Sequence, residues 1–140
     1  MVHRTARHSD EQYGKYNGLG GHLEPFEDIA AGMLREIKEE ASIDVTAMQF
    51  RGTVNWTGFG PNSESWIAVI FLITAFQGTP SLKNDEGSLE WVPVEDIMNL
   101  PIYEGDKYFL PLVFDKDPRP FHGYLKYDNE TPLEWKVTRM

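Results

Sequence analysis

Three glutamates gathered in one short stretch are the residues of this sequence best suited to chemistry. Glu36, Glu39 and Glu40 fall in a segment, residues 27–41, whose apolar residues recur at helical spacing. Successive helical residues turn by about 100°, so the three carboxylates share an arc of ~100° beside the apolar stripe. Like charges four residues apart destabilise a helix by ~0.2–0.5 kcal/mol, and partial burial raises a carboxyl pKa. A hard divalent cation would relieve this repulsion, although the run taken alone is more typical of a solvated helix face.

The elements that must position these glutamates show two hydrophobic periods. The apolar stripe of the predicted helix comprises Phe26, Ala30, Met33, Leu34, Ile37 and Ala41. Alternation over Met48–Trp56 predicts a half-buried strand, and the β-branched and aromatic run Trp66–Phe76 predicts a central strand covered on both faces. We also expect a strand end at Met1–Arg4, a loop over His8–Asn17, a turn at Gly58–Ser63, a strand at Leu89–Val92, a short helix at Val94–Leu100 opened by Pro93, helical turns at Lys107–Phe114, and a hairpin of Phe121–Tyr127 with Leu133–Thr138. This order predicts an α/β or α+β fold with a mixed sheet and flanking helices.

Length and charge narrow the classes of function. The 140 residues fit a single domain over 1–140. A net charge of −9 argues against binding a long nucleic acid, whose phosphates would repel it, but permits a small anionic substrate bridged by a cation. No apolar run is long enough to cross a bilayer, and the first residues lack the apolar core of a secretory signal. We therefore expect a cytoplasmic protein with no membrane partner.

The spacing around the glutamates is more specific than their charge. Gly21 is followed after five residues by Glu27, after seven more by Arg35-Glu36-Ile37, and after one more by Glu39-Glu40. This spacing resembles the Nudix box, G-x5-E-x7-R-E-U-x-E-E-x-G-U, in which U is a bulky aliphatic residue that Ile43 supplies at the end. Only Ser42 departs, where the family usually has a glycine that serves a helix C-terminal turn. The resemblance implies a Nudix hydrolase with the Nudix fold.

The resemblance also implies roles for individual residues. Glu36 and Glu40 would be the principal metal ligands, with Glu39 as a further ligand or base and the Gly20 backbone near the metal. Arg35 would orient these carboxylates through charge-assisted hydrogen bonds, and Glu27 would tie the preceding loop to the helix. Glu86, outside the box, matches a glutamate that approaches the metal and can act as a base; the alternative for Glu86 is a solvated loop acid. The implied cofactor is Mg²⁺, with Mn²⁺ as a substitute.

Outside the box the chain is similar to the MutT-like branch that hydrolyses oxidised purine nucleoside triphosphates such as 8-oxo-dGTP. The similar segments include Asn17–Gly21 and Phe121–Tyr124. The resemblance implies that Asn17 hydrogen-bonds the purine, although Asn-Gly is also a common turn. Trp56 would line the base pocket, or be plain core. The branch then places an aromatic and a pair of acids, which Tyr103 and Asp106 match, with Gly105 in place of the first acid. That replacement bears on base preference, and the alternative is that Glu104 substitutes for the acid from a different backbone position.

Two alternatives to this substrate stay open at the level of sequence. The same metal site could serve ADP-ribose, a dinucleotide polyphosphate or an unmodified nucleoside triphosphate. The second alternative is a regulatory module that binds a nucleotide without catalysis. The intact acids of the box argue against this alternative. The resemblance further implies a first strand that is mostly missing before Val2, so that a homodimer would cover the exposed sheet edge.

Overall fold

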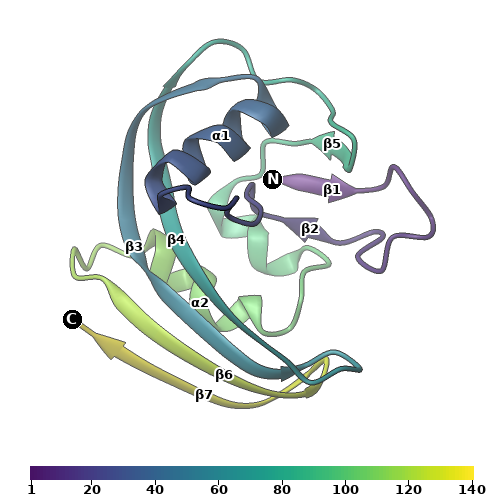
Figure 1. Ribbon diagram of the computed structural model, residues 1–140, viewed down its shortest axis with the longest axis vertical. Helices are drawn as coiled ribbons and strands as arrows, with labels where there is room; N and C mark the ends of the chain where they lie inside the picture. The colour runs from purple at the N-terminus through teal and green to yellow at the C-terminus, as the bar shows by residue number, and fades with distance from the viewer. The chain divides into compact units, whose positions relative to one another are not determined.

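The computed structural model describes residues 1–140 (Figure 1). The chain divides into two compact units. The first unit comprises residues 1–47 and 74–102, and the second comprises residues 48–73 and 103–140. Two long strands, β3 (Asp44–Phe59) and β4 (Glu64–Gln77), each contribute residues to both units. No helix is long and apolar enough to cross a membrane. The prediction of a single domain stays a prediction.

The first unit is organised around a small antiparallel sheet with the order β2-β1-β5. Its strands are β1 (Val2–Arg4), β2 (Tyr16–Asn17) and β5 (Gly87–Leu89). Val2, which is fully buried, pairs with Asn17 on one side and Leu89 on the other. The predicted strand at Met1–Arg4 is confirmed, and its neighbours occupy both of its edges. The predicted loop over His8–Asn17 ends in β2, and the predicted strand Leu89–Val92 lies two residues earlier, at Gly87–Leu89.

Helix α1 (Ile29–Ala41) belongs to the first unit and carries Glu36, Glu39 and Glu40. Its N-terminus is at Ile29 rather than Glu27, because the Asp28 side chain accepts a hydrogen bond from Ala31 N–H at 2.9 Å and caps the first turn. Ser42 ends the helix in the left-handed region, at φ 60°, and its N–H donates to Lys38 O at 3.0 Å. The serine therefore makes the turn for which a glycine was expected.

The predicted apolar stripe of α1 is only partly correct. Ile37 and Ala41 are buried, as expected, but Leu34 is 41% exposed. Phe26 precedes the helix at a positive φ of 65° and is fully exposed. The buried residues of the helix are Gly32, Ile37 and Ala41. The helix therefore packs along a narrower face than its apolar composition suggested. The short helix expected at Val94–Leu100 is a 3₁₀ helix, η1 (Val94–Asn99), which follows Pro93.

The second unit is built on a mixed sheet with the order β4-β3-β6-β7. Strand β6 (Phe121–Asn129) is parallel to β3 and antiparallel to β7 (Thr131–Arg139), which confirms the mixed sheet and the C-terminal hairpin. Strand β3 continues through Phe59 and therefore narrows the predicted turn to residues 60–63. The expectation that Trp66–Phe76 is a central strand is wrong. Because β6 pairs with the other side of β3, β4 is left at the edge of the sheet, and Ile67 is 75% exposed.

Helix α2 (Asp106–Phe114) contributes Val113 to the core of the second unit. The other buried members of this core cluster are Val54, Phe121, Leu125 and Tyr127. Arg51 of β3 is buried beside the end of the helix, and its Nε and Nη2 donate to Val113 O at 2.8 Å and Leu112 O at 3.0 Å. Its Nη2 also pairs with the Asp115 carboxylate at 3.0 Å. The guanidinium thus supplies donors to carbonyls that the helix cannot satisfy itself.

Replacing this buried guanidinium should destabilise the protein. We expect Arg51→Met to lower the free energy of unfolding by about 3 kcal/mol, because it removes donors from carbonyls that stay buried. Arg119, which is 62% exposed and paired with Asp117, is the matched control, and Arg119→Met should cost less than about 0.5 kcal/mol. Urea denaturation of the two variants measures the difference. Equal losses would show that Arg51 is no more than a surface ion pair.

Candidate active site

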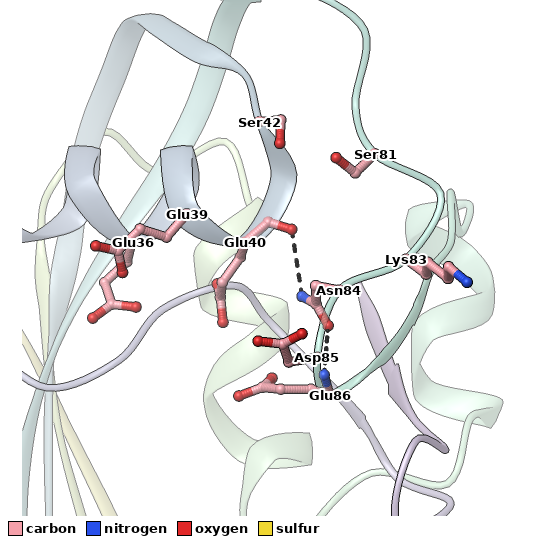
Figure 2. Close-up of a pocket in the computed structure, with 9 residues that line it drawn as sticks. All are labelled: Glu36, Glu39, Glu40, Ser42, Ser81, Lys83, Asn84, Asp85 and Glu86. Carbon is pink, nitrogen blue, oxygen red and sulfur yellow. Dashed lines mark hydrogen bonds between the residues drawn. The ribbon is translucent and has the colours of Figure 1, made fainter.

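The predicted catalytic glutamates line one cavity of the first unit, with a volume of about 330 Å³. Glu36, Glu39 and Glu40 reach it from the second half of α1, and Glu86 reaches it from the loop before β5 (Figure 2). The remaining lining residues are Ser42, Ser81, Lys83, Asn84 and Asp85. Figure 2 shows the carboxylates of Glu40 and Glu86 turned into the same space. Residues far apart in the chain thus meet at one acidic cavity.

Arg35 gathers most of the carboxylates of the box. Its Nε and Nη2 donate to the two oxygens of Glu27 at 2.7 and 2.9 Å, which forms a bidentate pair. Its Nη1 donates to Glu36 at 2.8 Å and to Glu39 at 3.1 Å. Glu27 also accepts the backbone N–H of Glu24 at 3.0 Å. One guanidinium therefore fixes the loop before α1 and aligns two glutamates of the cavity.

These contacts favour the charged forms of both partners. The hydrogen bonds from Arg35, helped by the Glu24 N–H, lower the pKa of Glu27 to about 2. The hydrogen bonds from Glu27 and Glu36 raise the pKa of Arg35 above its already high ordinary value. Both groups are consequently charged at neutral pH, and the ion pair does not titrate there.

Glu40 is in a different electrostatic setting. It is half-buried and accepts the Gly20 backbone N–H at 2.8 Å. Burial, together with the charges of Glu86 and Glu36, raises its pKa to about 7 against the lowering effects of the Gly20 N–H and Arg4. A nearby cation would favour the charged carboxylate and offset both effects.

The donor set of this cavity fits a hard divalent cation. Carboxylate oxygens are the protein ligands that Mg²⁺ prefers, and several of them face the cavity beside a desolvated glutamate. No three aspartate, glutamate or histidine side chains, however, are already grouped as ligands of a single ion. Arg35 holds Glu36 and Glu39, while a backbone N–H holds Glu40. Glu36, Glu39 and Glu40 would therefore hold an ion together with water and substrate phosphate, as is usual for Mg²⁺.

The glycine pair before α1 has a steric reason. A Cβ on Gly21 would lie 2.5 Å from the Glu36 carboxyl carbon and from one of its oxygens. The carboxylate of Glu36 therefore lies against bare backbone, where any side chain would displace it. Gly20 lies at a φ of 149°, a conformation that L side chains rarely adopt, and from there its N–H reaches Glu40.

Two residues that position Glu86 could not be found from the sequence. Arg4 Nη1 pairs with Glu86 at 3.0 Å while its Nε bonds Asp10 at 2.7 Å. The Asn84 side-chain oxygen accepts the N–H groups of Glu86 and Gly87 at 2.9 and 3.2 Å, and its amide donates to Glu40 O at 3.4 Å (Figure 2). Asn84 therefore connects the loop to the end of α1. Asn84 lies two residues before Glu86, a spacing typical of an asparagine side-chain turn, whereas nothing in the sequence links Arg4 to Glu86 or Asn84 to Glu40.

The residues expected to bind the base are distributed between the units. Asn17 ends β2 in the first unit, and its amide donates to the Gln12 side chain. In the second unit, the Asp106 N–H donates to Tyr103 O at 3.0 Å, which places these two residues together at the start of α2. Tyr103 packs edge-on against Phe59, with 5.7 Å between ring centroids. Trp56 is partly buried against the core, as the alternative of a core role also predicts.

Comparison with known proteins identifies the class. The NUDIX domain matches residues 1–113. The chain is 31% identical over 117 residues to the uncharacterized Nudix hydrolase YvcI of Bacillus subtilis, covering 81% of this chain and 73% of that protein. It is 28% identical over 125 residues to the oxidized purine nucleoside triphosphate hydrolase of Mus musculus, covering 89% and 78%.

Solved structures agree with this assignment. The crystal structure of the mutator MutT protein from Bacillus halodurans superimposes with a TM-score of 0.74 at 25% identity, covering 85% of this chain and 79% of that one. The chain belongs to the Nudix family and is a MutT-like Nudix hydrolase. The fold class and the family predicted from the box are confirmed. Divalent cations are the cofactors that this family generally uses.

A methyl group at Gly21 should disturb the cavity without unfolding the protein. We expect Gly21→Ala to lower kcat/KM for hydrolysis at least ~10-fold, because the new Cβ must displace the Glu36 carboxylate. Gly18 is the matched control, since a Cβ there meets nothing within 4 Å and its φ is not strained. Steady-state kinetics with circular dichroism measures both variants. A Gly21→Ala enzyme as active as Gly18→Ala would rule out this steric role.

The Glu27–Arg35 pair should stabilise the protein in a defined pH range. Because the folded-state pKa of Glu27, about 2, lies below its ordinary value of 4.5, its contribution is complete above pH 4.5 and is lost as pH falls toward 2. We expect Glu27→Gln to be less stable than the wild type near pH 6, and the gap to narrow steadily below pH 4.5. Urea denaturation at several pH values measures it, with exposed Glu130→Gln as the control. A gap that is constant with pH would contradict the pairing.

Proposed function

We propose that this Nudix hydrolase is a Mg²⁺-dependent pyrophosphohydrolase of oxidised purine nucleoside triphosphates such as 8-oxo-dGTP, with Mn²⁺ able to substitute. The observation that carries the proposal is the acidic cavity, in which Glu40 and Glu86 face the same space as Glu36 and Glu39. The similarity to relatives named oxidized purine nucleoside triphosphate hydrolase, in mouse and in Danio rerio, supports the choice of substrate.

In the proposed reaction, water attacks phosphorus and the P–O bond that joins the α- and β-phosphates breaks. The products are a nucleoside monophosphate and pyrophosphate. When bound, the divalent cation neutralises charge on the phosphate oxygens and makes water easier to deprotonate. Glu36 and Glu40 bind it, and the Gly20 backbone fixes Glu40 through its N–H. Because phosphate hydrolysis needs little covalent participation from the protein, most of the catalysis is positioning and electrostatics.

The remaining charged residues either hold the ligands or receive the proton. Arg35 keeps Glu36 and Glu39 in place through charge-assisted hydrogen bonds of 2.8 and 3.1 Å. Glu39 serves as a further ligand or as the base, since it is 58% exposed and is held by only one of these bonds. Glu86 is the other candidate base, because it lines the cavity and its charge acts on Glu40. Arg4 and Asn84 position Glu86.

We further propose that Asn17, Trp56, Tyr103 and Asp106 recognise the base. The adjacency of Tyr103 and Asp106 at the start of α2 supports the proposal for these two, and the amide of Asn17 can both donate and accept. The single domain, the cytoplasmic location and the covering of a sheet edge by a homodimer remain expectations from sequence. A small nucleotide is the only partner that the function requires.

A panel of substrates tests the proposal against its alternatives. The protein is incubated with Mg²⁺ and 8-oxo-dGTP, 2-hydroxy-dATP, dGTP or ADP-ribose, and the products are separated by anion exchange. The proposal predicts monophosphate and pyrophosphate from the oxidised nucleotides at a higher kcat/KM than from dGTP. AMP from ADP-ribose with slow turnover of the others would favour a different Nudix specificity. Binding without turnover would favour a regulatory module.

The catalytic assignment of Glu40 gives a sharper test. We expect Glu40→Gln to reduce kcat at least ~100-fold, a loss of about 2.7 kcal/mol in barrier lowering, while the fold is retained. The reason is that the neutral amide of glutamine lacks the negative charge with which the Glu40 carboxylate would hold a divalent cation. Glu95→Gln, at an exposed position of η1, is the control and should keep wild-type turnover. Turnover of Glu40→Gln within about threefold of wild type would refute the role.

A further inference from the structure

Gly105 stands where the resemblance implies the first acid of a pair, and the side chain of Tyr127 lies in the space beside it. A Cβ built on Gly105 would lie 1.7 Å from the Tyr127 hydroxyl oxygen and 2.8 Å from the ring carbon that carries it. No atom can occupy that position while Tyr127 holds its present conformation. The phenol of Tyr127, from strand β6, already fills the space that a Cβ at residue 105 would need. Only glycine fits there.

The position of Tyr127 follows from the pattern of β6. Phe121, Leu125 and Tyr127 face inward at alternate positions and are buried in the core cluster. Tyr127 is the last of them, so its ring packs edge-on against Phe59 at 5.1 Å while its hydroxyl extends to the start of α2. Phe59 in turn contacts Tyr103. The hydroxyl thus lies beside the two residues, Tyr103 and Asp106, that are proposed to contact the base.

The chemistry of the hydroxyl differs from that of the acid it replaces. Burial, with smaller contributions from the nearby Asp106, Tyr103 and Tyr108, raises the pKa of Tyr127 to about 12. The phenol therefore keeps its proton at neutral pH. A neutral phenol can donate one hydrogen bond and accept others, whereas a carboxylate only accepts. Two neighbouring carboxylates would repel, and one of them would tend to hold a proton.

We propose that the Tyr127 hydroxyl, standing where a side chain at residue 105 would lie, selects the purine base together with Asp106. The inference rests on the proposed function and names one more residue of the same site. The pair presents a fixed acceptor beside a donor. It therefore complements a base edge that carries an N–H group next to a carbonyl oxygen or ring nitrogen. Loss of the hydroxyl removes discrimination among bases and leaves the hydrolytic machinery intact.

Substrate competition in a Tyr127→Phe variant tests the selection. The probes are 8-oxo-dGTP, dGTP, 2-hydroxy-dATP and dATP, each with Mg²⁺ and each also measured for Kd by competition. We expect at least one pairwise ratio of kcat/KM to change ~10-fold, through KM or Kd, while kcat for the preferred nucleotide stays within about threefold. Tyr124→Phe is the matched control, because Tyr124 lies on the same strand as Tyr127 but its hydroxyl hydrogen-bonds Thr57 Oγ1 of β3 at 3.1 Å. This variant should leave the ratios unchanged.

A double-mutant cycle tests the steric part independently of activity. Gly105→Ala should lower Tm by roughly 5 °C or more in the wild type, and by clearly less in Tyr127→Phe, from which the atom at 1.7 Å is gone. Equal penalties in both backgrounds, or Tyr127→Phe ratios within about twofold of wild type, would overturn the inference. A wild type that binds these nucleotides with selectivity yet releases no pyrophosphate would overturn the proposed function alone, since the Kd ratios still report on Tyr127.

Discussion

The carboxylates of helix α1 are compensated unevenly, and the rest of the site depends on that inequality. A single guanidinium serves Glu27, Glu36 and Glu39 through four hydrogen bonds of 2.7 to 3.1 Å. Glu40, one turn beyond Glu36, accepts a backbone N–H instead and lies beside the charge of Glu86. Glu27, Glu36 and Glu39 are therefore each paired with a cationic side chain. Glu40 is left with burial and like charge acting against its ionisation, which a divalent cation would reverse.

This inequality explains the parts of the chain that surround the helix. The bidentate Glu27–Arg35 pair fixes the loop before α1, and Gly21 leaves open the space in which the Glu36 carboxylate lies. On the opposite side of the cavity, Asn84 joins the end of α1 to the loop that carries Glu86. At Gly20 and Gly21 the backbone therefore lies directly against the carboxylates of Glu40 and Glu36, with no side chain between them. A rigid arrangement of this kind suits a reaction in which positioning supplies most of the rate.

The sequence predicted those features that depend on local spacing. The box placed Arg35, Glu36, Glu39 and Glu40 on one helix, and the hairpin predicted for Phe121–Tyr127 with Leu133–Thr138 is present as β6 and β7. Features set by long-range pairing were missed. The apolar run of β4 predicted a central strand, but strand order is decided by the parallel pairing of β6 with β3, which no local pattern records. Arg4 meets Glu86, and Asn84 meets the backbone of Glu40, through the fold alone, and the hydroxyl of Tyr127 reaches Gly105 across 22 residues of sequence.

The central claim is that the carboxylates of α1 and Glu86 form a binding site for a divalent cation. Electron paramagnetic resonance of Mn²⁺ titrated into the protein at neutral pH measures this without reference to any substrate. The account predicts saturable uptake of Mn²⁺ at millimolar concentration or below, tightened by nucleotide and abolished in a Glu36→Gln, Glu40→Gln double variant that remains folded. Uptake that is absent with and without nucleotide, or that is the same in the double variant, would contradict it.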